Sequence, residues 1–120
     1  MSRTLAALAL AAAGCASTPI VVREFDDRSG VEGGGGIAAE ELQAALGRAV
    51  RPAGWIVVGT VESAGEGPGG WTASLSVRMM RTDTTEVVLI RDAKGAGRDV
   101  RGAIRDAASK LVDPLKAAAR

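Results

Sequence analysis

Two adjacent carboxylates and a run of four glycines lie in one stretch, EFDDRSGVEGGGGIAAEEL, residues 24–42. Glycine-rich loops that enter a helix can cradle phosphate, and paired carboxylates can hold magnesium. A phosphate loop normally continues with a lysine and a serine or threonine, whereas here Glu40 and Glu41 follow and no cation is supplied. The stretch therefore predicts an adaptable connector over residues 26–36, with the glycines at 33–36 exposed and mobile.

Asp26 and Asp27 are neighbours on a chain that is extended just before them. Side chains of adjacent residues in an extended chain point to opposite faces, so both can bind one ion only if the backbone turns there. A magnesium site would also need further oxygen ligands. We expect one aspartate to accept backbone hydrogen bonds at the turn and the other to be solvated, with no metal and no cofactor.

Catalytic groups are scarce in the rest of the chain. It contains no histidine, which removes the usual general base and the usual zinc ligand. Ser109 and Lys110 are adjacent in a predicted helix and do not face each other. Trp55 and Trp71 each lie at the beginning of a predicted strand, and we expect them to pack at the core or its rim rather than to form an aromatic ligand-binding site. We therefore predict no catalytic residues and no enzyme.

The first residues, MSRTLAALALAAAGC, have the features of an export signal. Arg3 precedes a short apolar run that is too short to span a membrane, and small residues lead to Cys15. The end AAGC resembles the lipobox of bacterial lipoproteins, which predicts a signal peptide over residues 1–14 and a lipid on Cys15. The alternative is a lone buried cysteine after an ordinary secretory signal. Cys15 is the only cysteine and cannot form an internal disulfide, which favours the lipid.

This assignment predicts a lipidated cysteine and linker over residues 15–18 and a single domain over residues 19–120. Ala16 and Ser17 follow the cysteine without an aspartate, which by resemblance to sorted lipoproteins favours the periplasmic face of the outer membrane. Of the 15 basic residues, Arg3 leaves with the signal, so 14 basic side chains balance 14 acidic ones. A neutral domain has no electrostatic basis for binding nucleic acid.

Hydrophobic periodicity predicts the elements of this domain. Strands are expected over residues 17–25, 54–63, 71–80 and 86–95, with a flexible turn over 64–70 and a tight one over 81–85. A helix is expected over residues 37–50, with Glu40 and Glu41 in its first turns and Arg48 and Arg51 at its end. A second helix is expected from residue 100, kinked or ended by Pro114. The first helix has its apolar positions at Ala38, Leu42, Ala45, Leu46, Ala49 and Val50.

The order β-α-β-β-β-α predicts an α/β fold, a two-layer sandwich of about four strands with two helices on one face. The first strand, helix and second strand form a right-handed parallel crossover, and the remaining strands form an antiparallel meander. The third strand alternates between apolar residues and Thr72, Ser74, Ser76 and Arg78, which is typical of a sheet with one covered and one wet face.

Several pieces of this pattern resemble one group of envelope proteins. IVVxxFDDxSG followed by GIAAEELQAAL, then GWIVVGTVES, the hairpin ASLSVRMMRTDTTEVVLI and the helix AIRDAASKLVDPL are similar to the curli-secretion lipoprotein family. The amino-terminal domain of the Tol propeller protein and the lipoprotein activators of peptidoglycan synthases begin similarly. The chain lacks a strand and helix of these families and the membrane-inserting segments of the curli pore. The resemblance implies assembly or recruitment and carries no catalytic residues over.

Two functions of different class follow. The first is a monomeric module that recruits an envelope protein partner for cell-wall synthesis or envelope assembly. The second is a self-associating subunit of a ring that serves export of a polysaccharide or fibre across the outer membrane. In both, the membrane partner is reached through the lipid on Cys15, and no small-molecule cofactor is involved.

Overall fold

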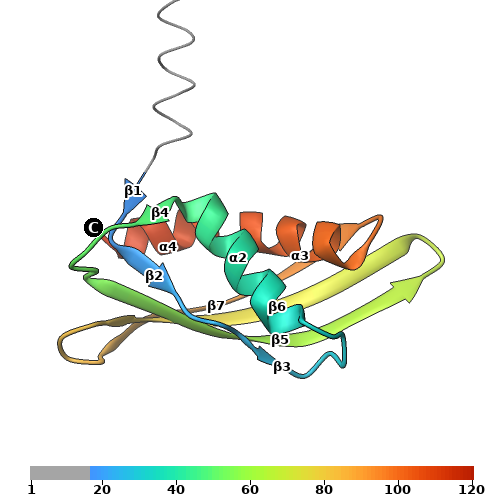
Figure 1. Cartoon of the computed structure of the whole chain (residues 1–120), viewed down its shortest axis with the longest axis horizontal. Helices are drawn as coiled ribbons and strands as arrows, with labels where there is room; N and C mark the ends of the chain where they lie inside the picture. Colours follow the sequence, from blue (N-terminus) through green and yellow to red (C-terminus); the bar gives the residue numbers. More distant parts are fainter. Residues whose placement is uncertain (1–16) are drawn as a thin grey trace, which may run out of the picture.

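The computed structural model describes residues 17–120, and the predicted signal peptide and Cys15 lie outside the described residues. One layer is a mixed sheet and the other consists of helices that cover one of its faces, as the sequence predicts (Figure 1). The elements, in chain order, are β1 (Ser17–Thr18), β2 (Ile20–Val22), β3 (Asp26–Asp27), α2 (Gly34–Leu46), β4 (Arg48–Ala49), β5 (Trp55–Gly67), β6 (Gly70–Arg81), β7 (Val87–Gly97), α3 (Val100–Ser109) and α4 (Val112–Ala118).

The sheet has the strand order β2-β5-β6-β7, with β3 pairing beside β2 on the same edge of β5. β2 and β5 are parallel and are connected through α2, which confirms the predicted crossover. β5, β6 and β7 form the predicted antiparallel meander. A separate two-stranded pairing joins β1 to β4 in parallel, and it contains Ser17 and Thr18, which lie both in the predicted linker 15–18 and in the predicted strand 17–25.

The core lies between the helices and one face of the sheet. β6 contributes alternate residues to it, and Ala73, Leu75, Val77 and Met79 are all buried, which confirms the predicted alternation. The ring of Phe25 lies against Gly59 in β5, where a Cβ atom would be 2.5 Å from the ring. Phe25 is thereby buried at the end of the segment that leads from β2 to β3.

The turn predicted over residues 64–70 is wrong in extent. β5 continues to Gly67 and β6 starts at Gly70, so only Pro68 and Gly69 connect them. Gly70 has φ 114°, a conformation that glycine adopts without strain, and this permits the tight reversal. The glycines of this segment therefore extend the hairpin rather than interrupt it.

The first helix is shifted towards the amino terminus relative to the prediction of residues 37–50. α2 begins at Gly34 and ends at Leu46, because Gly47 with φ 115° stops it. Glu40 and Glu41 consequently lie in the middle of the helix, while Arg48 and Arg51 lie beyond it. Val50, predicted to lie on the buried stripe, is 40% exposed.

The second predicted helix is divided into α3 and α4. The break lies at Lys110 and Leu111, whose amide groups donate to carbonyls three residues earlier. Pro114 has no N–H to donate to the carbonyl of Lys110, and its ring would clash with that carbonyl in a continuous helix. Pro114 therefore acts one turn before its own position, and the chain resumes as α4 with Leu115 buried.

Candidate functional site

The glycine run at residues 33–36 is the first candidate site from the sequence. The prediction of an exposed loop holds for Gly33 but is wrong for the other three glycines, because Gly34, Gly35 and Gly36 form the first turn of α2 and the first two are buried. A Cβ atom on Gly35 would overlap the carbonyl oxygen of Phe25, and one on Gly34 would lie 2.8 Å from a carboxylate oxygen of Asp27. The glycines thus allow the start of α2 to approach the β2–β3 segment.

Asp27 lies directly against this helix start. Its Oδ1 accepts a hydrogen bond from the amide of Ser29 at 2.8 Å and another from the Ser29 hydroxyl. These bonds, together with one from the amide of Gly34, lower the pKa of Asp27 below its ordinary value of 3.8. A carboxylate already occupies the position that a phosphate would take at this helix, so the geometry disfavours anion binding.

Asp26 and Asp27 are both in β3, not in a loop, and the structure separates them. Asp27 contacts Ser29 and the start of α2, whereas Asp26 pairs with Thr60 in register and borders the uncovered side of the sheet. Among residues 17–120, no three potential metal-ligating side chains lie close enough together to hold an ion.

The other sequence candidates have ordinary structural contacts. The Ser109 hydroxyl donates to the carbonyl of Asp106, and Lys110 Nζ donates to the carbonyl of Lys94 at 2.6 Å, so the two side chains do not act on each other. The Trp55 ring is half-buried with the guanidinium of Arg81 4.8 Å from its centre, a cation–π contact at one end of the sheet.

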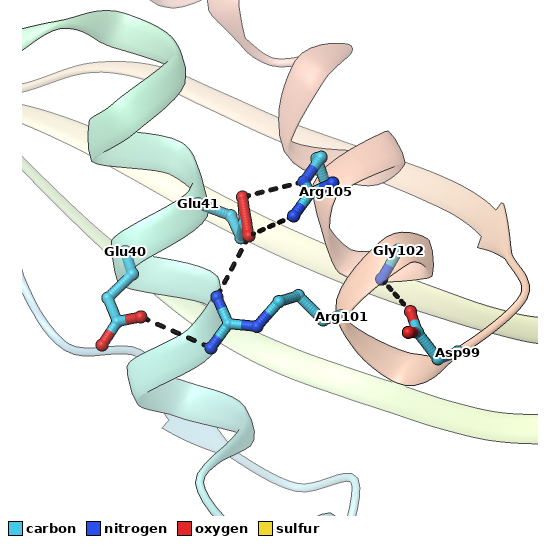
Figure 2. Close-up of polar contacts among 6 residues, drawn as sticks. All are labelled: Glu40, Glu41, Asp99, Arg101, Gly102 and Arg105. Carbon is cyan, nitrogen blue, oxygen red and sulfur yellow. Dashed lines mark hydrogen bonds and ion pairs between the residues drawn. The ribbon is translucent and has the colours of Figure 1, made fainter.

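A charged cluster joins α2 to α3 (Figure 2). Glu41 on α2 accepts hydrogen bonds at 3.1 Å from Arg101 and, through both of its oxygens, from Arg105, both on α3. These contacts, with Arg105 the larger influence, lower the pKa of Glu41 below its ordinary value of 4.5. Glu40 contacts Arg101 more loosely at 3.5 Å. The cluster has its charges matched internally, so it fixes α2 against α3 and leaves no unbalanced charge for a ligand.

On the face of the sheet that the helices do not cover, side chains point away from the core. The strand register aligns them in rows across the sheet. The apolar row consists of Val21, Ile56, Met80 and Val87. The basic row consists of Val58, Arg78 and Ile90, with exposed Arg23 at its β2 end. The acidic row consists of Asp26, Thr60, Ser76 and Asp92.

Charge is segregated between the last two rows. Arg23 and Arg78 lie in one row and Asp26 and Asp92 in the next, roughly 6.6 Å away along the strands. The ion pairs found within residues 17–120 involve none of these four side chains. Ile90 stands beside them with 62% of its surface exposed.

A hollow of about 250 Å³ is lined by residues of both rows, including Asp26, Arg78 and Ile90. The alternation in β6 predicted a wet face, but the rows arise from the register between paired strands, which periodicity alone does not reveal.

No known protein-family profile matches the chain, and no curated protein sequence does. Solved structures match the chain in fold. PelC dodecamers from Paraburkholderia phytofirmans in two crystal forms match with TM-scores of 0.71 and 0.68 at 13% and 14% identity. These matches cover 82% and 80% of this chain and 88% and 85% of PelC. Lipoprotein GNA1162 from Neisseria meningitidis matches with a TM-score of 0.50 at 16% identity, over 85% of this chain and 92% of that one.

At these identities the likeness is one of fold, and that fold is one that lipoproteins adopt. Within residues 17–120, no helix has both the length and the apolar character needed to cross a bilayer.

Proposed function

We propose that the chain is a lipid-anchored, non-catalytic subunit of a bacterial envelope assembly and that it associates with copies of itself through the uncovered face of the sheet. The observation that carries this proposal is the pair of oppositely charged rows on that face, whose four charged side chains form no ion pair with any other residue in the range 17–120. The likeness to PelC, which forms dodecamers, supports self-association over the monomeric alternative.

The rows are self-complementary under a two-fold axis that lies in the interface. If two copies face each other with the axis running between the rows and perpendicular to the strands, the basic row of each copy lies over the acidic row of the other. Arg23 then meets Asp26 of the second copy, and Arg78 lies over Ser76 with Asp92 in the next strand. Each contact occurs twice, as a two-fold interface requires. Exposed Ile90 is covered in the same arrangement.

The anchor in this proposal is a lipid on Cys15, facing the periplasm from the outer membrane. The fold permits it, because the described chain starts with exposed Ser17 in β1 at one end of the molecule (Figure 1). Mass spectrometry of the membrane fraction tests this part. A chain that begins at Cys15 and carries acyl groups is expected, and an unmodified Cys15 thiol would refute the anchor.

Self-association is tested with the lipidated full chain in detergent by analytical ultracentrifugation. We expect a concentration-dependent oligomer. Arg78→Asp should weaken association roughly tenfold or more, because it places like charges together across the interface. Adding Asp92→Arg to that variant should restore association, while Arg91→Asp, on the opposite face of β7, should have no effect.

Two outcomes would contradict the proposal. A monomer at all concentrations would exclude self-association and favour the recruitment module for another envelope protein. An oligomer that Arg78→Asp leaves unchanged would place the interface elsewhere. Export of a polysaccharide or fibre, and membership of the curli-secretion group, are finer hypotheses within this function.

A further inference from the structure

The end of the molecule that carries the amino terminus has its own surface chemistry. β1, β4, α4 and the carboxyl terminus gather there, opposite the β5–β6 hairpin (Figure 1). The segment between β4 and β5 projects from this end with Arg48, Val50, Arg51 and Pro52 all exposed. From this arrangement we infer that residues 48–53, the β4–β5 segment, form a docking surface for anionic phospholipid headgroups. The inference rests on the lipid anchor proposed above.

Covalent geometry limits how far this segment can be from the lipid. Ser17 is two residues after Cys15, so their Cα atoms are at most about 7 Å apart. Ser17 pairs with Arg48, and the amide of Val50 donates to the carbonyl of Thr18 at 2.9 Å. Paired strands are about 4.8 Å apart, which places Arg48 Cα within about 12 Å of an acylated residue 15. The polar headgroup zone is itself about 5–8 Å thick on each side of a bilayer, so Arg48 must lie at or just above it.

The chemistry of the segment suits that position. The stretch between Glu41 and Glu62 contains no acidic residue, and Arg48 and Arg51 are the only charged residues in it. Neither arginine takes part in the ion pairs found among the described residues. Val50 stands between them with 40% of its surface exposed, which suits insertion among headgroups while the guanidinium groups bind phosphate.

A hollow between the β4–β5 segment and the neighbouring strands provides a second feature. It has a volume of about 690 Å³, with an apolar part formed by Val21, Pro52, Ala53 and Ile56 and a cationic part formed by Arg23 and Arg51. The guanidinium group of Arg51 next to an apolar wall matches a phosphodiester joined to hydrocarbon. Arg51, Pro52 and Ala53 of the β4–β5 segment line the hollow, so a phospholipid headgroup that reaches this segment can also reach the hollow.

The test uses the lipidated full chain in vesicles made of phosphatidylglycerol and phosphatidylcholine, with a quencher attached to the lipid headgroup. An environment-sensitive fluorophore is placed through Val50→Cys, and a control fluorophore is placed through Gly69→Cys at the tip of the β5–β6 hairpin. Because β5 runs for 13 residues between these ends, the two labels are roughly 40 Å apart. We expect at least threefold stronger quenching at position 50 than at position 69.

Charge reversal provides the second measurement. Arg48→Glu combined with Arg51→Glu should clearly weaken the preference for position 50 in vesicles containing phosphatidylglycerol, whereas Arg91→Glu on β7 should preserve it. Equal quenching at positions 50 and 69 in a membrane-bound chain would overturn the inference. So would a preference that is unchanged by the double reversal.

The same samples distinguish a failure of the docking surface from a failure of the proposed lipid anchor. A lipidated Cys15 has no free thiol, so each variant takes up one fluorophore. Two fluorophores on each chain, together with loss of vesicle binding, would show that the anchor proposal has failed. One fluorophore with vesicle binding but no difference between positions would show that only the docking surface has failed.

Discussion

Gly35→Ala tests why glycine stands at the start of α2. The added Cβ atom would overlap the Phe25 carbonyl oxygen, which belongs to the backbone and cannot rotate away. Gly36 provides a matched control one residue later, because a Cβ atom there would meet only the Glu24 side chain, at 3.6 Å. Both positions lie in the same helical turn, so their intrinsic helix propensities are comparable.

The expected magnitudes have opposite signs. Gly36→Ala should stabilise the protein by up to about 1 kcal/mol, because alanine loses less backbone entropy in a helix. At Gly35 the same gain is offset by overpacking, typically about 1–3 kcal/mol. The helix must also move away from Phe25, whose amide donates to the Gly35 carbonyl at 3.2 Å. Loss of that bond adds about 1–3 kcal/mol, so we expect Gly35→Ala to destabilise by roughly 3 kcal/mol.

Urea denaturation followed by circular dichroism measures both variants against the parent chain. The two substitutions should differ by about 4 kcal/mol in free energy of unfolding, the sum of the estimated loss at Gly35 and gain at Gly36. A stabilising Gly35→Ala would refute the close approach of α2 to Phe25. A loss of stability in both variants would instead indicate that the glycine run needs conformations other than helix.

The contacts of four acidic residues give the remaining predictions. Replacing Asp26 and Asp27 together with asparagine should cost about 1 kcal/mol, because an asparagine at position 27 can still accept the hydrogen bonds from Ser29, and Mg²⁺ or ATP should not raise the melting temperature of the parent chain. Glu41→Gln should cost about 1 kcal/mol and Glu40→Gln less than about 0.5 kcal/mol, since only Glu41 is largely enclosed by its two arginines. The folded-state pKa values of Asp27 and Glu41 are depressed, so their stabilisation is fully present above pH 3.8 and 4.5 respectively and is lost as pH falls through the lower folded values. Acid titration of unfolding should therefore be less steep below these values in the Asp27→Asn and Glu41→Gln variants, and unchanged slopes would contradict the assigned contacts.

The sequence predicted the layers and the strand pairing because these depend on periodicity. The alternation from Trp71 to Met79 identified both faces of β6, and the short connections identified the meander. The helix boundaries could not be predicted in the same way. Glycine has low helix propensity, so the run at 33–36 favoured a loop, yet the close approach of Gly34 to Asp27 and of Gly35 to Phe25 leaves no room for a side chain at either position. Tertiary contact overrides local preference at that point.

The candidate surfaces were harder to predict than the fold. Arg78 was placed on the wet face by its position in β6, but its neighbours on that face come from other strands and from a register that the sequence does not display. Arg48 and Arg51 were assigned to the end of a helix, where their positive charges would have interacted favourably with the helix dipole. Gly47 ends the helix before them, and the pairing of β4 with β1 carries them to the end where the chain enters the fold.

One orientation of the anchored molecule allows both proposed surfaces to be used at the same time. The β4–β5 segment lies at the anchored end, whereas the charged rows lie on the flat face of the sheet, which runs away from that end along β5 and β6 (Figure 1). Docking of the segment on the bilayer would hold the sheet upright, so its uncovered face would point along the membrane surface. Neighbouring anchored copies would meet that face by diffusion in two dimensions. Contact with the membrane would thus orient the charged rows for self-association, and removal of Arg48 and Arg51 is expected to weaken assembly on anionic vesicles more than in detergent.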